Sequence, residues 1–417
     1  MEAGGQSPAQ CCRTEAPVFR RIRALLPVGS KAELTELSKL SGPLILAQLM
    51  IYGVSLFSTI FCGHLGKEEL AGVSIAISVI NVTGISIGIG LASACDTLIS
   101  QTYGSGNLLR VGVIIQRAVL ILLLACFPCW AILINTESIL KHFTDIRVSE
   151  NRLNVASTTV FVFLSPPQGV VYPLVITGFL VNLLNVLINY ILLFVFDLGV
   201  AGSAIANAVS QFSMAGSLHA YVMWKGLYKT TWGGWSQQCL QDWGSYARLA
   251  IPGMVMLCAE WWSYEIGSFL AGIISEVELG AQSVVFQLAN IAYMCPMGFG
   301  IAGCVRVGNA LGAGQTEQAK LSAKMTLLSA GQWTLEAASS GVIRGAGKQK
   351  VGAFCIVVGY YALGLPTGII LMFVAKLGIL GLWIGMLICA SLQCSFLITY
   401  LMRMNWNNAT VEVSILG

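Results

Sequence analysis

The sequence has little charge. Only 10% of its 417 residues are Asp, Glu, Lys or Arg, whereas soluble proteins carry roughly 25%. Such a chain cannot cover the surface of a water-exposed fold, which excludes a soluble enzyme, a nucleic-acid-binding protein and a disordered scaffold. Hydrophobic residues make up 56% of the chain instead. This composition is typical of a polytopic membrane protein in contact with membrane lipids.

Histidine is also scarce. The three histidines, at positions 64, 142 and 219, are too scattered to indicate a metal-ligand cluster. The thirteen cysteines lie mostly inside apolar runs, where a free cysteine behaves as a small hydrophobic residue. We therefore expect neither a metal site nor a disulfide framework.

Long apolar runs dominate the chain. A spanning helix needs roughly 20 mostly apolar residues, and nine runs meet that requirement. A segment in lipid must bond its own backbone, and these runs lack the alternation typical of β-barrel strands. We predict an all-α polytopic membrane protein. The runs are 44–62, 73–94, 111–134, 170–196, 200–224, 249–274, 281–304, 351–374 and 377–402.

Two further pieces are too short to assign directly. The weak apolar stretch 153–168 ends in two prolines, which stop a helix. We expect the chain to cross here as a truncated or broken helix, because otherwise the basic residues between 225 and 248 would lie outside. The piece 325–343 lies between two basic clusters. It is too short for two full passes, so we expect it to enter the membrane and return.

The two halves of the chain repeat each other. The stretch from Pro43 matches the stretch from Pro252, and the separation of matched residues falls from 209 and 208 positions to 179 toward the end. The second half has therefore lost about 29 residues, between positions 314 and 377. Both halves begin on the cytosolic side, which indicates parallel repeats and a transporter with its substrate site between two bundles.

Charge placement sets the orientation. Basic residues precede the first apolar run, so the positive-inside rule places the N-terminus in the cytosol. The predicted segments are a cytosolic N-terminal segment (1–40), an N-lobe helix bundle (41–225), a cytosolic inter-lobe linker (226–248), a C-lobe helix bundle (249–403) and a C-terminal tail (404–417).

Acidic residues inside apolar runs are the candidate functional residues. Glu260 and Glu265 lie in the run 249–274, where a central charge costs roughly 2.5–3.5 kcal/mol on insertion scales. At about 100° per residue they point about 140° apart, so they need not share a partner. Glu336 lies in the short piece and is either a third membrane acid or a cytosolic loop residue. We interpret Asp96, near the end of the second run, as an interfacial cap.

Aromatic residues surround the first of these acids. Trp261 and Trp262 follow Glu260 directly, and Tyr264 comes four residues after it. A carboxylate beside aromatic faces suits an organic cation, which gains an ion pair and a cation–π attraction. An interfacial aromatic belt is the alternative for the tryptophans. Tyr293 on the next helix either adds to the same pocket or simply packs.

Two glycine turns, 104–106 and 312–314, occupy matching positions in the repeats. Neither is followed by the Lys-Ser/Thr pair of a phosphate-binding loop, so we interpret them as tight cytosolic turns.

Six peptides are distinctive: FCGHLG (61–66), SACDTLISQTYG (93–104), TWGGW (231–235), CAEWW (258–262), VRVGNALG (305–312) and GKQKVG (347–352). With them the chain resembles the vertebrate multidrug and toxin extrusion (MATE) family of proton-coupled organic cation exporters. The resemblance implies twelve helices in two six-helix bundles that open alternately to each side. It implies no cofactor, because a proton gradient drives transport, and a place in the plasma membrane, apical in epithelia.

The resemblance also assigns residues. The family's C-lobe glutamates match Glu260 and Glu265, and the acid of its tenth helix matches Glu336. A further family acid, on the eighth helix, falls at Gln287. Compared with the family pattern, the fourth helix is cut short, the ninth helix and the start of the tenth are missing, and an extra C-terminal helix is absent.

The sequence thus predicts export of small organic cations in exchange for protons. Two alternatives stay open. In one, the shortened chain no longer transports and acts as a non-transporting membrane partner. In the other, the same fold exports a different cargo, such as a lipid-linked compound or a metabolite.

Overall fold

The computed structural model describes residues 29–66, 77–134, 171–329 and 335–416 of the chain. Within these ranges the chain forms helices and turns, and no strand occurs among them. The prediction of an all-α fold is therefore confirmed. The stretch 153–168, predicted to cross the membrane as a broken helix, lies outside the described residues.

The first half of the chain (residues 29–225) supplies five long helical segments, two of which contain a π-helical turn. They are α2 (Ser30–Leu65), η1 (Asn81–Ile85) with α4 (Ser86–Gly104), α5 (Leu108–Ile134), α8 (Val171–Tyr190) with η2 (Ile191–Val195), and α9 (Gly199–Lys225). Two short 3-10 turns, η3 (Leu227–Thr230) and η4 (Gln237–Leu240), lead on to the second half.

The second half (residues 243–416) begins with two helices of more than thirty residues, followed by shorter pieces. They are α10 (Trp243–Ile274), α11 (Glu276–Gly312), α12 (Thr316–Ser329), α13 (Leu335–Gly345), α14 (Gln349–Val357) continuing through η5 (Val358–Gly364), α15 (Leu365–Ile369) and η6 (Ile370–Val374), then α16 (Ile379–Arg403) and α17 (Trp406–Leu416).

Each of the nine predicted runs coincides with helix where it is described, apart from Phe196, Leu377 and Gly378 at the ends of two runs. By length and composition, seven described helices are suited to cross a membrane. The helices α9 and α10 are also long, with 27 and 32 residues, but fall outside that set of seven. In α10 the two glutamates Glu260 and Glu265 lower the hydropathy, which keeps this helix outside the set.

The short piece 325–343 falls on two short helices. The helices α12 and α13 have 14 and 11 residues, or about 21 and 16 Å at 1.5 Å per residue. Neither alone crosses a hydrocarbon core of about 30 Å. The first follows directly on α11, and the second ends at Gly345, whose carbonyl lies at the end of α4. This arrangement agrees with a segment that enters and returns, whereas a loss of residues relative to the family stays a prediction.

The predicted segment boundaries stay predictions, and helices extend across or occupy three of the predicted segments. The helix α2 begins at Ser30, inside the segment predicted as a cytosolic N-terminal extension, and α10 begins at Trp243, inside the predicted linker. The predicted C-terminal tail contains α17, which packs against the second half with Trp406, Ala409 and Val413 buried. The tail is therefore an ordered helix over most of its length.

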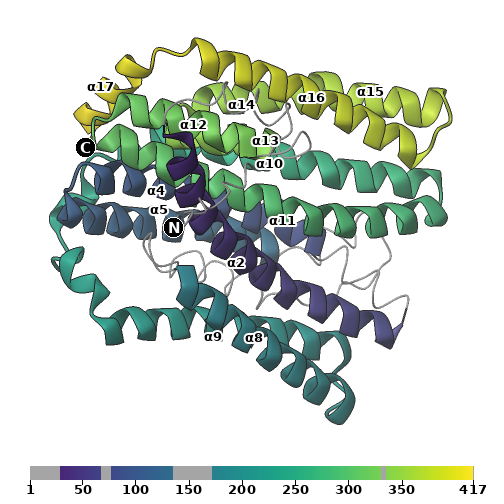
Figure 1. Ribbon diagram of the computed structural model, residues 1–417. Helices are drawn as coiled ribbons and strands as arrows, with labels where there is room; N and C mark the ends of the chain where they lie inside the picture. Colours follow the sequence, from purple (N-terminus) through teal and green to yellow (C-terminus); the bar gives the residue numbers. More distant parts are fainter. Residues whose placement is uncertain (1–28, 67–76, 135–170, 330–334, 417) are drawn as a thin grey trace, which may run out of the picture.

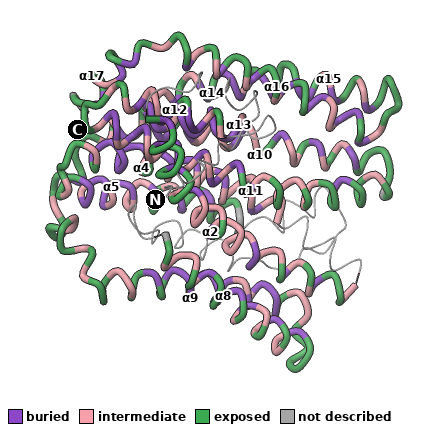
Figure 2. Tube along the Cα trace, viewed as in Figure 1, coloured by how far each residue is buried: buried purple, intermediate pink, exposed green. Residues whose placement is uncertain are grey.

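The helices lie side by side in a bundle (Figure 1). Buried residues follow the helix faces that point to neighbouring helices, and exposed residues follow the outer faces (Figure 2). Large apolar side chains are common outside, for example Phe127 at 66% and Trp224 at 79% exposed. Water does not tolerate so much apolar surface on a monomer, which agrees with an outer surface that faces lipid.

Candidate functional site

Glu260 lies in the middle of α10, on the side that faces α11. The hydroxyl of Tyr293, on α11, donates a hydrogen bond to its Oε1 at 3.1 Å. Both side chains are half-buried. The structure therefore brings together the acid and the tyrosine that the sequence placed on consecutive helices.

Glu336 opens the first turn of α13 and has an equivalent partner. The hydroxyl of Tyr360, in η5, donates to its Oε1 at 3.0 Å. The two carboxylates, Glu260 and Glu336, lie within electrostatic reach of each other. Glu336 thus lies in a helix at a contact beside Glu260 and not in a loop, and its role as a membrane acid stays a prediction.

The ring of Tyr264 packs against one of the acid–tyrosine pairs and lies within electrostatic reach of the other. It packs against Tyr360 with the ring centroids 6.2 Å apart, and against Phe286 and Trp383 at 5.7 and 6.3 Å. We call Glu260, Tyr264, Tyr293, Glu336 and Tyr360 the carboxylate–tyrosine cluster.

The other predicted residues lie outside this cluster. Trp262 points to the first half of the chain, where its Nε1 donates to the carbonyl of Val82 at 3.1 Å. Trp261 is half-buried. Glu265 is half-buried too, and within the described residues it has no hydrogen-bond or ion-pair partner. The expected angular separation of the two acids on α10 accounts for this difference.

The interpretation of Asp96 as a helix cap is wrong. The helix α4 continues for eight residues beyond it, to Gly104, because the polar residues that follow are helical and buried against the second half. Asp96 instead is an exposed residue part-way along α4, within electrostatic reach of Arg344 on α13. The same arginine also acts on Glu260. In the sequence Arg344 belongs to the second of the two basic clusters that flank the piece 325–343.

Two residues of the site, Tyr360 and Arg344, were not predicted from the sequence. Tyr360 lies in an apolar run and resembles an ordinary packing residue, so only the position of α13 reveals its role. Arg344 lies eight residues after Glu336 on the same helix, too far along it for a direct i,i+4 pair, so only the packing of α13 reveals its proximity to Glu260 and Asp96. Gln287, where the family has an acid, accepts a hydrogen bond from the hydroxyl of Tyr52 on α2 and so joins the two halves.

The chemistry of the cluster suits a transient positive charge. Two carboxylates share a partly buried space with three tyrosines, and neither acid has a lysine or arginine within ion-pair distance among the described residues. Aromatic faces attract organic cations beside such acids. The described residues contain no group of three or more His, Cys, Asp or Glu side chains suited to a metal ion.

Comparison with known proteins decides the family. Residues 43–165 and 252–331 match the MatE family, and the two matches begin at Pro43 and Pro252, the positions from which the internal repeat was counted. Multidrug and toxin extrusion protein 1 of Danio rerio is 52% identical over 95% of this chain and 76% of its own length. The chain belongs to the multidrug and toxin extrusion (MATE) family. The human protein of the same name is 46% identical over 95% of this chain and 79% of its own length.

Solved structures of MATE transporters have the same fold as this chain. The crystal structure of the eukaryotic MATE transporter AtDTX14 superposes with a TM-score of 0.87 at 27% identity, covering 93% of this chain and 99% of that one. The chain is therefore a multi-pass membrane transporter of the MATE efflux type with the two-bundle fold, and not an enzyme. Such transporters are driven by ion gradients and need no cofactor.

Proposed function

We propose that this protein is a secondary active transporter that exports small organic cations in exchange for protons. The observation that carries the proposal is the placement of Glu260. This acid lies midway along α10, receives a hydrogen bond from Tyr293 and stands beside Glu336 without a fixed cationic partner among the described residues. The names of its relatives, multidrug and toxin extrusion proteins, support the same direction of transport.

The proposed mechanism is competition for one negative charge. Deprotonated Glu260 binds the cation from the cytosolic side, and the two bundles rock so that the site faces outward. There a proton neutralises the acid and releases the cargo. In a low-dielectric site one carboxylate cannot balance two positive charges at low cost, so proton and cation exclude each other.

The remaining residues receive roles that follow from the geometry. Tyr293 and Tyr360 hold the two acids in place through their hydroxyl groups. Tyr264, packed on Tyr360, presents an aromatic face to the cargo. Trp261, Trp262 and Glu265 stay candidates for contact with the cargo on its way to the cluster. The transporter is proposed to lie in the plasma membrane, apical in epithelia, with its N-terminus in the cytosol.

A non-transporting membrane partner is the second candidate, and one observation favours it. The alignment with the Danio rerio relative spans 454 positions, more than the 417 residues of this chain, so the relative has segments that this chain lacks. The short helices α12 and α13 carry one of the two acids. A loss of residues there would affect transport first at Glu336.

Transport by the purified full chain separates the two candidates. Proteoliposomes with an acidic interior should take up a fluorescent organic cation, and Glu260→Gln should abolish this uptake while the protein still inserts. The matched control is Glu317→Gln on α12, since Glu317 is exposed and pairs only with Lys320 of the same helix. A flat trace from well-folded wild-type protein would favour the non-transporting partner. Uptake by Glu260→Gln at the wild-type rate would reject the role of Glu260.

A further inference from the structure

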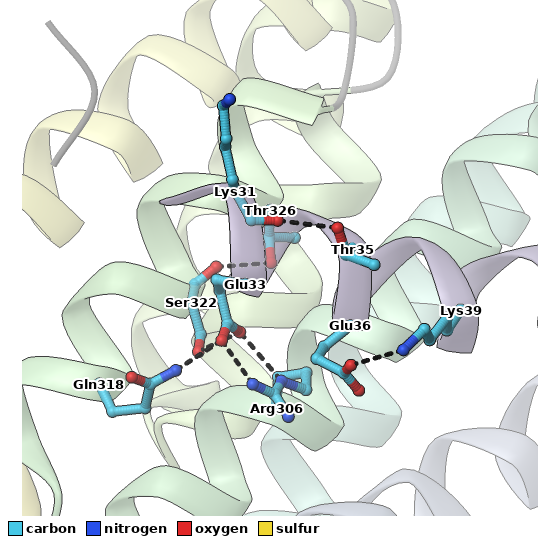
Figure 3. Close-up of polar contacts among 9 residues, drawn as sticks. All are labelled: Lys31, Glu33, Thr35, Glu36, Lys39, Arg306, Gln318, Ser322 and Thr326. Atoms are coloured by element: carbon cyan, nitrogen blue, oxygen red, sulfur yellow. Dashed lines mark hydrogen bonds and ion pairs between the residues drawn. The ribbon is translucent and has the colours of Figure 1, made fainter. Parts of the chain in front are cut away.

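A buried acid at the start of α2 is held by the other half of the chain. Glu33 is 3% exposed and accepts four hydrogen bonds (Figure 3). Arg306 donates from Nε at 2.9 Å and also from Nη2, forming an ion pair with both carboxylate oxygens. Gln318 donates at 2.5 Å and Ser322 at 2.7 Å.

All of these donors come from the second half of the chain. Glu33 belongs to the first half, whereas Arg306 is on α11 and both Gln318 and Ser322 are on α12, in the second half. A buried carboxylate is stable only while its charge is paired and its oxygens are bonded. Separating the halves at this point would remove all four donors together and leave the acid exposed to water.

The same end of the molecule holds two very close approaches between the halves. A Cβ on Gly104 of α4 would overlap the backbone carbonyl of Asn309 on α11, and a Cβ on Gly312 would overlap that of Gln101. These contacts are equivalent in the two repeats, because Gly104 and Gly312, like Gln101 and Asn309, are 208 positions apart. The repeats therefore cross each other with approximate two-fold symmetry at this end.

The contact between α2 and the second half does not extend to the far end. Figure 1 shows α2 beside α12 near its start and away from α11 at its end. Tyr52, bonded to Gln287, is the last residue of α2 with a hydrogen bond to the second half among the described residues. The two halves are thus held together at the Glu33 end of α2. At the end that contains Leu65, α2 forms no hydrogen bond to the second half among the described residues.

We propose that Glu33, Arg306, Gln318 and Ser322 form a latch between the two halves that closes and opens once in each transport cycle. The latch stabilises the state in which the Glu33 end is shut, so it sets the balance between the two orientations of the transporter. This inference rests on the rocking motion of the proposed function. It does not depend on which ion or cargo is transported.

The chain provides a matched control on the same helix. Glu36, one turn after Glu33, pairs with Lys39 at 2.9 Å. Both of these side chains are more than half exposed and belong to α2, and their hydrogen bond lies within that helix. Glu36→Gln therefore removes the same charge from the same helix, also within electrostatic reach of Arg306, but it breaks none of the hydrogen bonds of the latch.

Hydrogen–deuterium exchange of the full chain in lipid nanodiscs, at one fixed pH, tests the latch. In Glu33→Gln we expect about 10- to 100-fold faster exchange in peptides around 30–40 and 316–325, which is the effect of losing a charged hydrogen bond. We also expect slower exchange at the opposite ends, in peptides around 54–65 and 266–274, because rocking closes that side. Glu36→Gln should match the wild type at both ends.

Arg306→Gln and the double variant complete the test. Each single variant should give the same two-ended pattern, and Glu33→Gln with Arg306→Gln should be no more affected than either alone, because both remove one interaction. Faster exchange at the Glu33 end with no change at the far end would identify a local structural tie and overturn the latch. Since exchange is measured without a gradient or cargo, a failure of cation–proton exchange in proteoliposomes is a separate result.

Discussion

Tyr360 donates its hydroxyl hydrogen to Glu336 across the contact between η5 and α13, at 3.0 Å. Tyr360 is 1% exposed, whereas Tyr361, the next residue, is 37% exposed. The buried tyrosine thus fixes the direction of an acid that stands on a helix of only 11 residues. The position of Glu336 in the cluster therefore depends on this hydrogen bond as well as on α13.

Replacing Tyr360 with phenylalanine should therefore slow transport. The ring stays and the donor is lost, and a hydrogen bond to a charged group contributes about 1.5–3 kcal/mol, so we expect about a 10- to 100-fold lower rate of proton-driven cation uptake. Initial rates in proteoliposomes at equal protein content measure the effect. Tyr361→Phe is the control and should match the wild type. Equal rates for the two variants would show that the hydroxyl of Tyr360 has no part in transport.

The sequence predicted the acids better than their partners. Glu260 could be found because a charge inside an apolar run is costly and needs a reason. Tyr360 could not, because a tyrosine in an apolar run carries no such signal and its partner depends on how α13 packs. The same limit applies to Arg344, which local charge grouping assigned to a basic cluster and which the fold brings near Glu260.

Helix ends and helix crossings were also hard to predict from the sequence. Asp96 looked like a cap because the apolar run stops near it, but buried polar residues extend α4 to Gly104. The two glycine turns are confirmed as turns, since Gly106 and Gly314 have φ of 80° and 73°, and their cytosolic side stays a prediction. The role of Gly104 and Gly312 at the crossing was missed, because a repeat shows that two positions are equivalent and says nothing of what they touch.

The two glutamates of α10 should differ in their effect on transport. Glu260 belongs to the carboxylate–tyrosine cluster, whereas Glu265 has no hydrogen-bond or ion-pair partner among the described residues. We expect Glu260→Gln to abolish pH-driven uptake and Glu265→Gln to lower its rate by less than about tenfold. Uptake rates at several interior pH values measure both. If Glu265→Gln also abolished uptake, the cargo or the proton would have to contact Glu265 directly, and the cluster would need to include it.

The crossing of α4 and α11 should be intolerant of a single methyl group. At Gly312 an added Cβ meets the backbone of Gln101, which cannot move aside as a side chain could, so Gly312→Ala should lower stability by about 1–3 kcal/mol. The midpoint of thermal unfolding in detergent, followed by tryptophan fluorescence, measures the change. Gly42→Ala is the control, because a Cβ there meets nothing within 4 Å and alanine favours a helix. Gly104→Ala should behave like Gly312→Ala, since the repeats give both residues the same contact. A midpoint for Gly312→Ala equal to that of Gly42→Ala would mean that the two helices are not in contact there in the membrane protein.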